Sequence, residues 1–131
     1  MSQIKDGFYY SKEHEWVQIL DENTVRIGIS DYAQEQLGEI VFIELPEVGA
    51  QVQAGDSVGS VESVKAVSDL YSPVTGTVVQ VNSLLENSPQ TVNESPFDEG
   101  WMFEIKLDDP GQLKELLNAE QYKELIEGDG I

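Results

Sequence analysis

Short runs of alternating apolar and polar residues, separated by turn residues, occupy the first two-thirds of the chain. The clearest run covers residues 24–30, where Val25, Ile27 and Ile29 fall on one face. A period of two is typical of a strand with one buried face, and turns at short intervals favour an all-β sandwich or barrel. A parallel sheet would require helical patterns between these runs, and the sequence between them does not contain any.

The same reasoning predicts strands over residues 14–20, 24–30, 40–45, around 52, 57–64, 67–71, 77–81 and 101–107. Together they predict a mainly β fold, a flattened barrel-sandwich of two antiparallel sheets, with a β core over about residues 8–107. Phe42 and Trp101 are expected to be buried in that core. Residues 82–100 are polar and proline-containing, which predicts a long ordered loop.

Helices are expected at only two places. Ser30 is typical of a helix N-cap, and Gly38 would end the short helix that follows it. After the last strand, Asp109 can cap a helix and Pro110 suits its first position. C-terminal helices are therefore predicted over about residues 110–127.

Composition excludes several classes of function. The chain of 131 residues has no cysteine and one histidine, so disulfides, cysteine nucleophiles and histidine-based zinc sites are not expected. Seven basic and 25 acidic residues give a net charge of −18, which would repel nucleic acid and anionic membranes. No targeting segment or membrane span is recognisable, so a cytoplasmic location is expected over a mature organellar form. The length suits one domain over residues 1–131.

One lysine stands apart from the other basic residues. Between Arg26 and Lys106 the only basic residue is Lys65, at the expected turn between two strand-like runs. Its neighbours Val64 and Ala66 are small or apolar and would leave its amine reachable. Taken alone, such a lysine is more often a surface residue that adds solubility or protects a sheet edge.

The sequence Glu62-Ser63-Val64-Lys65-Ala66 resembles the lipoyl and biotinyl carrier domains, which present one modified lysine at a hairpin tip. Within that superfamily the chain resembles the H proteins of the glycine cleavage system over about residues 8–125. The segments that carry this resemblance, in the family's order, are residues 10–17, 27–38, 41–49, 61–66 and 96–102.

This resemblance implies that Lys65 carries lipoate in amide linkage and that the protein is a carrier, not an enzyme. It would receive an aminomethyl group from a pyridoxal-phosphate glycine decarboxylase (P protein) and deliver it to a tetrahydrofolate-dependent aminomethyltransferase (T protein). A dihydrolipoyl dehydrogenase (L protein) would reoxidise the arm, and a lipoate-attaching enzyme would modify the lysine. Nucleic-acid and membrane partners are not expected, and a monomer is the simplest state for a shuttle.

The resemblance also implies that acidic side chains near the arm's docking cleft receive the amine of the cargo. The matching positions are Glu15 and Asp69, and Glu13 is a weaker match. Some family members have a histidine where this chain has Gln36, so no role for that imidazole is carried over. His14 is expected to be structural.

Three alternative functions are weighed against this resemblance. A biotin carrier would flank its lysine with methionines, which this chain does not have there. A lipoyl domain of a 2-oxoacid dehydrogenase would typically have Asp before the lysine and belong to a longer chain with linkers rich in alanine and proline. An enzyme with paired carboxylates, such as a glycosidase, is a further class, but 25 acidic residues make chance pairs common.

Overall fold

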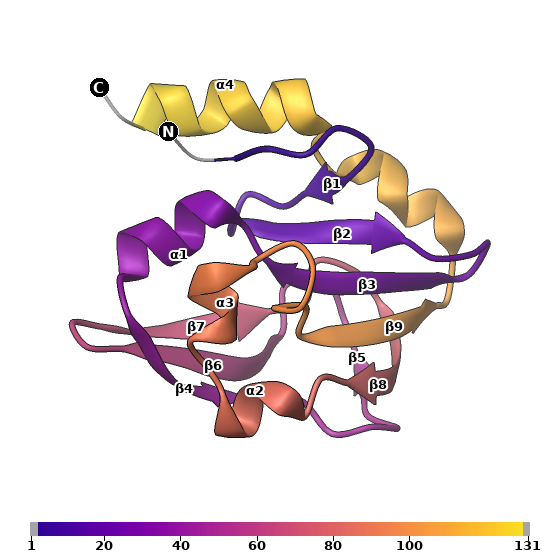
Figure 1. Cartoon of the computed structure of the whole chain (residues 1–131). Helices are drawn as coiled ribbons and strands as arrows, with labels where there is room; N and C mark the ends of the chain where they lie inside the picture. Colours follow the sequence, from indigo (N-terminus) through magenta and orange to yellow (C-terminus); the bar gives the residue numbers. More distant parts are fainter. Residues whose placement is uncertain (1–2, 130–131) are drawn as a thin grey trace.

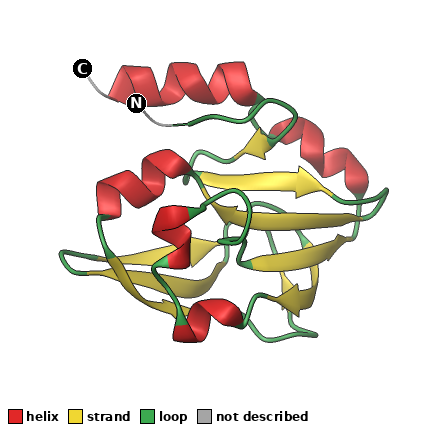
Figure 2. Cartoon of the chain, viewed as in Figure 1, coloured by secondary structure: helices red, strands yellow, loops and turns green. Residues whose placement is uncertain are grey.

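Antiparallel pairing of the alternating segments builds two sheets, as the sequence predicts (Figures 1 and 2). The structure is a computed structural model and describes residues 3–129. The larger sheet has the strand order β1-β2-β3-β9-β8-β5, and the smaller sheet has the order β4-β6-β7. The strands are β1 (Tyr9–Tyr10), β2 (Glu15–Ile19), β3 (Thr24–Ile29), β4 (Ile40–Glu44), β5 (Gln51–Val52), β6 (Ser57–Ser63), β7 (Val67–Tyr71), β8 (Gly76–Val81) and β9 (Phe103–Leu107).

The main core lies between the two sheets. In β3 the side chains of Val25, Ile27 and Ile29 are at most 5% exposed, which confirms the period-two interpretation. The register places Val25 opposite Ile105 and Ile27 opposite Phe103, so β3 and β9 share one buried face. The smaller sheet contributes the buried residues Ile43, Val61 and Leu70 to the same core.

A second apolar cluster lies on the opposite face of the larger sheet, where α4 (Ala119–Asp129) runs over β1 and β2 (Figure 1). Its buried residues are Tyr10, Trp16, Phe97 and Tyr122. The rings of Tyr10 and Tyr122 stack with their centroids 4.5 Å apart. This stacking ties the C-terminal helix to the first strand.

The predicted caps are confirmed. The Ser30 hydroxyl accepts a hydrogen bond from the Ala33 amide at the start of α1 (Asp31–Leu37), and Gly38 ends this helix with a φ of 80°. Near the C-terminus, the Asp109 carboxylate accepts from the Gly111 amide, and Pro110 opens the helix. This first C-terminal stretch, Pro110–Glu115, is a 3₁₀ helix rather than an α-helix.

The expectation of a loop over residues 82–100, with helices at only two places, is wrong. This segment contains two one-turn helices, α2 (Leu84–Asn87) and α3 (Thr91–Glu94). Leu85 and Val92 are fully buried, so each turn attaches to the core through one apolar side chain. The Asn93 side chain accepts from the Ile40 amide and donates to the Gly38 carbonyl, which fixes α3 against the end of α1.

The predicted burial of Phe42 is also wrong, because 48% of its side chain is exposed. A bulge between Ile40 and Phe42 breaks the alternation in β4. Ile40 and Ile43 consequently face the core, and the two residues between them face solvent. Trp101 is only half-buried, with its ring centroid 4.6 Å from the Arg26 guanidinium.

These two environments predict different costs for the same truncation. Phe103 is fully buried, so Phe103→Ala is expected to lower the free energy of unfolding by ~3–5 kcal/mol. Phe42→Ala removes a half-exposed ring and is expected to cost less than ~1.5 kcal/mol. Urea denaturation followed by tryptophan fluorescence measures both, and equal losses would contradict this assignment of the core.

Candidate functional site

Lys65 lies at the tip of the hairpin formed by β6 and β7. The turn is closed by the Ser63 amide, which donates to the Ala66 carbonyl at 2.8 Å. The Ser63 hydroxyl oxygen accepts from the amides of Lys65 and Ala66 at 3.3 and 3.1 Å. The backbone that carries Lys65 is therefore held by its own side-chain and main-chain bonds, which fixes the direction in which the lysine leaves the hairpin.

The Lys65 side chain itself is exposed. Its stem lies beside the C-terminal end of α1, since a Cβ at Gly38 would be 3.5 Å from Lys65 Cε. Within residues 3–129, no carboxylate lies at ion-pairing distance from its ammonium. A lysine presented in this way is accessible to an enzyme that modifies it.

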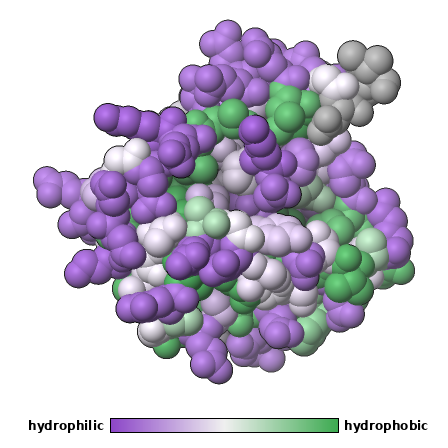
Figure 3. Space-filling model, turned by 180° about the vertical axis from the view of Figure 1, so that it is seen from behind, coloured by the Kyte–Doolittle hydropathy of each residue, from purple (hydrophilic) through white to green (hydrophobic). Residues whose placement is uncertain are grey.

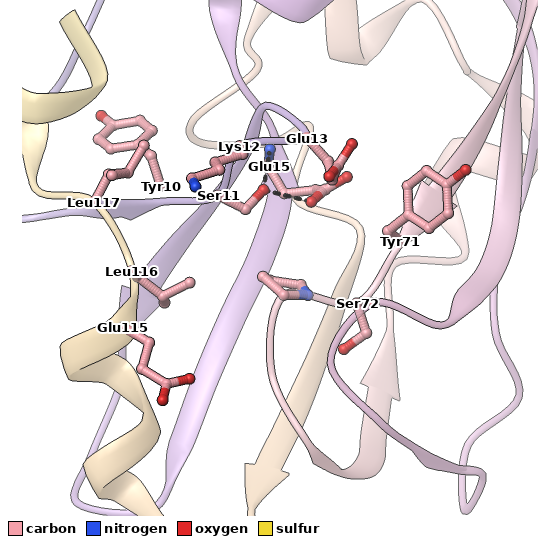
Figure 4. Close-up of a pocket in the computed structure, with 12 residues that line it drawn as sticks. Tyr10, Ser11, Lys12, Glu13, Glu15, Tyr71, Ser72, Glu115, Leu116 and Leu117 are labelled. Carbon is pink, nitrogen blue, oxygen red and sulfur yellow. Dashed lines mark hydrogen bonds between the residues drawn. The ribbon is translucent and has the colours of Figure 1, made fainter. Parts of the chain in front are cut away.

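A pocket of about 230 Å³ lies away from this tip, between the loop before β2, the end of β7 and the C-terminal 3₁₀ helix (Figure 4). It combines carboxylates with apolar walls. Its lining residues are Tyr10, Ser11, Lys12, Glu13, Glu15, Gly55, Tyr71, Ser72, Pro73, Glu115, Leu116 and Leu117.

Glu15 is the most deeply placed carboxylate of this pocket and is only 2% exposed. The Ser11 hydroxyl donates to Glu15 Oε1 at 2.6 Å. Among the described residues, no lysine or arginine forms an ion pair with it. Burial raises the pKa of Glu15 from its ordinary value of 4.5 to about 8, although the Ser11 hydroxyl opposes this shift. Near neutral pH the resting pocket therefore holds Glu15 mainly as the neutral acid.

A tight loop over residues 11–15 puts Ser11 beside Glu15. The Ser11 amide donates to the Glu15 carbonyl at 2.9 Å, and the His14 amide donates to the Ser11 carbonyl at 3.1 Å. His14 is the one non-glycine residue of the described chain with a positive φ, 70°. Its Nδ1 lies 2.9 Å from the Tyr122 hydroxyl, which also lies 2.6 Å from the Ser30 hydroxyl. Through these contacts His14 is part of the packed structure that holds the loop over residues 11–15.

The three predicted docking residues are only partly brought together. Glu13 and Glu15 line the same pocket, whereas Asp69 does not. Asp69 is exposed on β7 and belongs to a separate hollow with Glu44 and Ser60 on the outer face of the smaller sheet. The residue that connects the two places is Tyr71, whose hydroxyl donates to Asp69 Oδ2 at 3.3 Å and whose ring lines the Glu15 pocket.

Sequence reasoning missed Ser11 and Tyr71. Tyr71 is two residues beyond Asp69 on a predicted strand, so the alternation of side chains already put both on one face. Ser11 precedes Glu15 by four residues in an irregular segment, and no periodic pattern signals such a contact.

Residues 3–129 contain neither a membrane-spanning helix nor a cluster of metal-ligating side chains. None of the helices has the length and apolarity needed to cross a bilayer. No three or more histidine, cysteine, aspartate or glutamate side chains are grouped as metal ligands would be.

Comparisons with known proteins agree on one family. The sequence model of the glycine cleavage H-protein family matches residues 8–129. The glycine cleavage system H protein of Teredinibacter turnerae is 54% identical over 129 residues, covering 98% of this chain and 99% of the relative. That of Staphylococcus haemolyticus is 59% identical over 117 residues, covering 89% of this chain and 92% of the relative.

A solved structure gives the same result. The crystal structure of a glycine cleavage system H protein from Mycobacterium marinum superposes with a TM-score of 0.85 at 38% sequence identity. The match covers 98% of this chain and all of the other. The chain therefore belongs to the glycine cleavage H-protein family, the lipoyl carriers of the glycine cleavage system.

Proposed function

We propose that this chain carries lipoate on Lys65 and shuttles an aminomethyl group through the glycine cleavage system without catalysing a step itself. The observation that carries the proposal is that Lys65 is exposed on a hairpin tip whose turn is held by hydrogen bonds to Ser63, in a chain of this family. The proposed partners are the glycine decarboxylase, the aminomethyltransferase, the dihydrolipoyl dehydrogenase and a lipoate-attaching enzyme.

The residues present fit a lipoyl arm. The exposed amine of Lys65 is available for the amide bond, and the pocket offers Leu116, Leu117 and Pro73 to an apolar chain and Glu13 and Glu15 to a cationic end. When attached, the lipoyl group supplies a disulfide that accepts the aminomethyl group on sulfur. Asp69 lies four residues from Lys65, with part of the hairpin turn between them, so the two Cα atoms are at most about 14 Å apart, a distance comparable to the length of a lysine side chain joined to lipoate.

Charge also supports a carrier with several enzyme partners. The net charge is −18, and most of the face seen in Figure 3 is hydrophilic. A field of this sign would steer the carrier toward basic entrances, and added salt would slow the encounter.

The pocket carboxylates have a defined task in this proposal. The neutral amine of an aminomethyl thioether can expel its thiolate, and water then converts the carbon to formaldehyde and the nitrogen to ammonium. Protonation occupies the amine's lone pair and prevents this loss. Glu15 and Glu13, helped by Asp69, would keep the amine protonated, and Glu15 would give up its own proton when the cation enters.

Lys65→Arg tests the attachment site. Arginine keeps the positive charge but does not form the amide, so lipoylation and glycine cleavage in a reconstituted system are expected to be lost while the far-ultraviolet circular dichroism is unchanged. Intact mass and peptide mapping detect the modification. Lys106→Arg, which alters an exposed lysine on β9, serves as the matched control. A lipoyl group found on any other lysine would refute the assignment.

Glu15→Gln tests the protection of the cargo. The variant keeps the shape of the side chain but loses the charge that a docked ammonium needs. Formaldehyde release from the aminomethyl-loaded protein, without partner enzymes, is expected to be about tenfold faster at pH 7. Glu22→Gln, in the exposed turn between β2 and β3, is expected to match the unaltered protein. Equal rates for all three proteins would contradict a protective role for Glu15.

The raised pKa of Glu15 predicts a pH-dependent stability in the lipoyl-free protein. Between pH 4.5 and about 8 the folded state binds one proton more than the unfolded state, so this residue lowers the free energy of unfolding as pH rises. Glutamine does not titrate, so Glu15→Gln is expected to gain ~1.4 kcal/mol per pH unit over the unaltered protein across this window. Urea denaturation at pH 5, 6, 7 and 8 measures this gain, and a constant difference would show that Glu15 is not held neutral.

A further inference from the structure

Two kinds of hydrogen bond hold the hairpin tip that carries Lys65. The bonds to the Ser63 hydroxyl lie within the turn and close it. A further bond leaves the turn, since the Val64 amide donates to the Glu39 carbonyl at 3.0 Å. Glu39 lies in the link between α1 and β4. The residue before Lys65 is therefore bonded to a part of the chain outside its own hairpin.

The same link is held from another side by Asn93, which lies in the one-turn helix α3. Asn93 Oδ1 accepts from the Ile40 amide at 2.9 Å. Its Nδ2 donates to the Gly38 carbonyl and to Gln34 Oε1, both at 2.8 Å. A main-chain N–H only donates and a main-chain carbonyl only accepts, so these partners determine which way the side-chain amide is turned.

One rigid peptide group connects the contacts of Asn93 with those of the tip. The Glu39 carbonyl and the Ile40 amide belong to the same peptide group, which is planar and trans, so they point in opposite directions. By holding the Ile40 amide, Asn93 therefore turns the carbonyl on the other side of this group toward the Val64 amide. A continuous path leads from Asn93 through this peptide group to the residue that precedes Lys65.

Gly38 gives Asn93 a second connection to the lysine. It ends α1 with a φ of 80° and a ψ of −151°, a conformation that essentially only glycine adopts. Its amide donates to the Gln34 carbonyl at 2.9 Å, and its carbonyl accepts from Asn93, so both of its polar groups are bonded. Since the stem of Lys65 lies beside Gly38, Asn93 holds the surface along which the lysine leaves the hairpin as well as the backbone of the tip.

We propose that Asn93 is a positioning residue for the modification of Lys65. It acts through the Glu39–Ile40 peptide group and through Gly38, and it fixes where the lysine amine is presented to the lipoate-attaching enzyme. The inference rests on the proposed function and adds a residue to it. Attachment joins one amine to one activated carboxyl group, so its rate depends on how closely the amine is held to the reacting position.

The first test follows hydrogen exchange in the lipoyl-free protein by nuclear magnetic resonance. Asn93→Ala is expected to speed exchange of the Val64 amide about fivefold, measured against the amide of the buried Leu107. Asn82→Ala is the matched control, because the Asn82 side chain also donates to two main-chain carbonyls, but in the segment before β9. It is expected to leave the Val64 rate unchanged. Equal Val64 rates in the two variants would overturn the proposal.

The second test measures the transfer of lipoate by a lipoate–protein ligase loaded with lipoyl-adenylate. The Lys65 amine forms a bond to the lipoyl carbonyl carbon, the bond from that carbon to AMP breaks, and the nitrogen loses a proton. Asn93→Ala is expected to lower the maximal rate about tenfold and to change the half-saturating carrier concentration less than twofold. Asn82→Ala is expected to change neither.

This division separates positioning from stability. A variant that is only less stable has an unfolded fraction, which raises the half-saturating concentration, while its folded molecules still react at the normal maximal rate. That result for Asn93→Ala would show that Asn93 contributes to stability alone, and it would overturn the proposal.

Gln34→Ala keeps the proposal testable if Asn93→Ala does not fold. It removes the side-chain oxygen that orients the Asn93 amide and leaves the two main-chain bonds of Asn93 in place. A smaller effect of about threefold is expected in both measurements, and no effect in either would overturn the proposal. If the unaltered protein does not accept lipoate on Lys65, the proposed function fails. If it does, and Asn93→Ala reacts as fast as Asn82→Ala, only the role of Asn93 is refuted.

Discussion

Packing of Trp16 against Gly28 determines where Glu15 lies. A Cβ at residue 28 would come within 2.6 Å of the Trp16 ring, so only glycine leaves room for the indole against the neighbouring strand. The indole nitrogen donates to the Pro96 carbonyl at 2.8 Å, which fixes the ring from the other side. Because side chains alternate along β2, fixing Trp16 on the α4 face turns Glu15 toward the inner face with Val17. The burial of the Glu15 carboxylate is therefore a consequence of where its neighbour Trp16 packs.

The fold was predictable wherever one residue pattern determines the local structure. The alternation at Val25, Ile27 and Ile29 predicted a half-buried strand, and Ser30 predicted a cap, because each depends on neighbours in sequence. The predictions were wrong where contacts between residues far apart in the sequence determine the local structure. The bulge in β4 turned Phe42 to solvent, and two one-turn helices formed in a polar segment because Leu85 and Val92 reach the core.

In the candidate site, too, local sequence patterns predicted some residues, and contacts between distant residues placed the others. Lys65 could be singled out because it is the only basic residue between Arg26 and Lys106 and its neighbours Val64 and Ala66 are small or apolar. The resemblance to H proteins implied that Glu15, Glu13 and Asp69 are docking residues, but it gave no distances between their side chains. Asp69 lies on the outer face of the smaller sheet because β7 directs alternate side chains there, and only the structure reveals that Tyr71 reaches back from it to the pocket.

Within residues 3–129, Glu15 is buried without a lysine or arginine partner, so its protonation could differ between the empty and the loaded state of the proposed pocket. While the pocket is empty, the high pKa keeps the carboxyl neutral, and no small cation has to be displaced. An ammonium group that enters supplies the missing charge and makes ionisation of Glu15 favourable. In the proposed cycle, Glu15 would take up a proton from solvent again when a partner enzyme removes the amine, and the pocket would lose its attraction for the arm. Under this proposal, protonation of one buried residue would link cargo loading to docking of the arm.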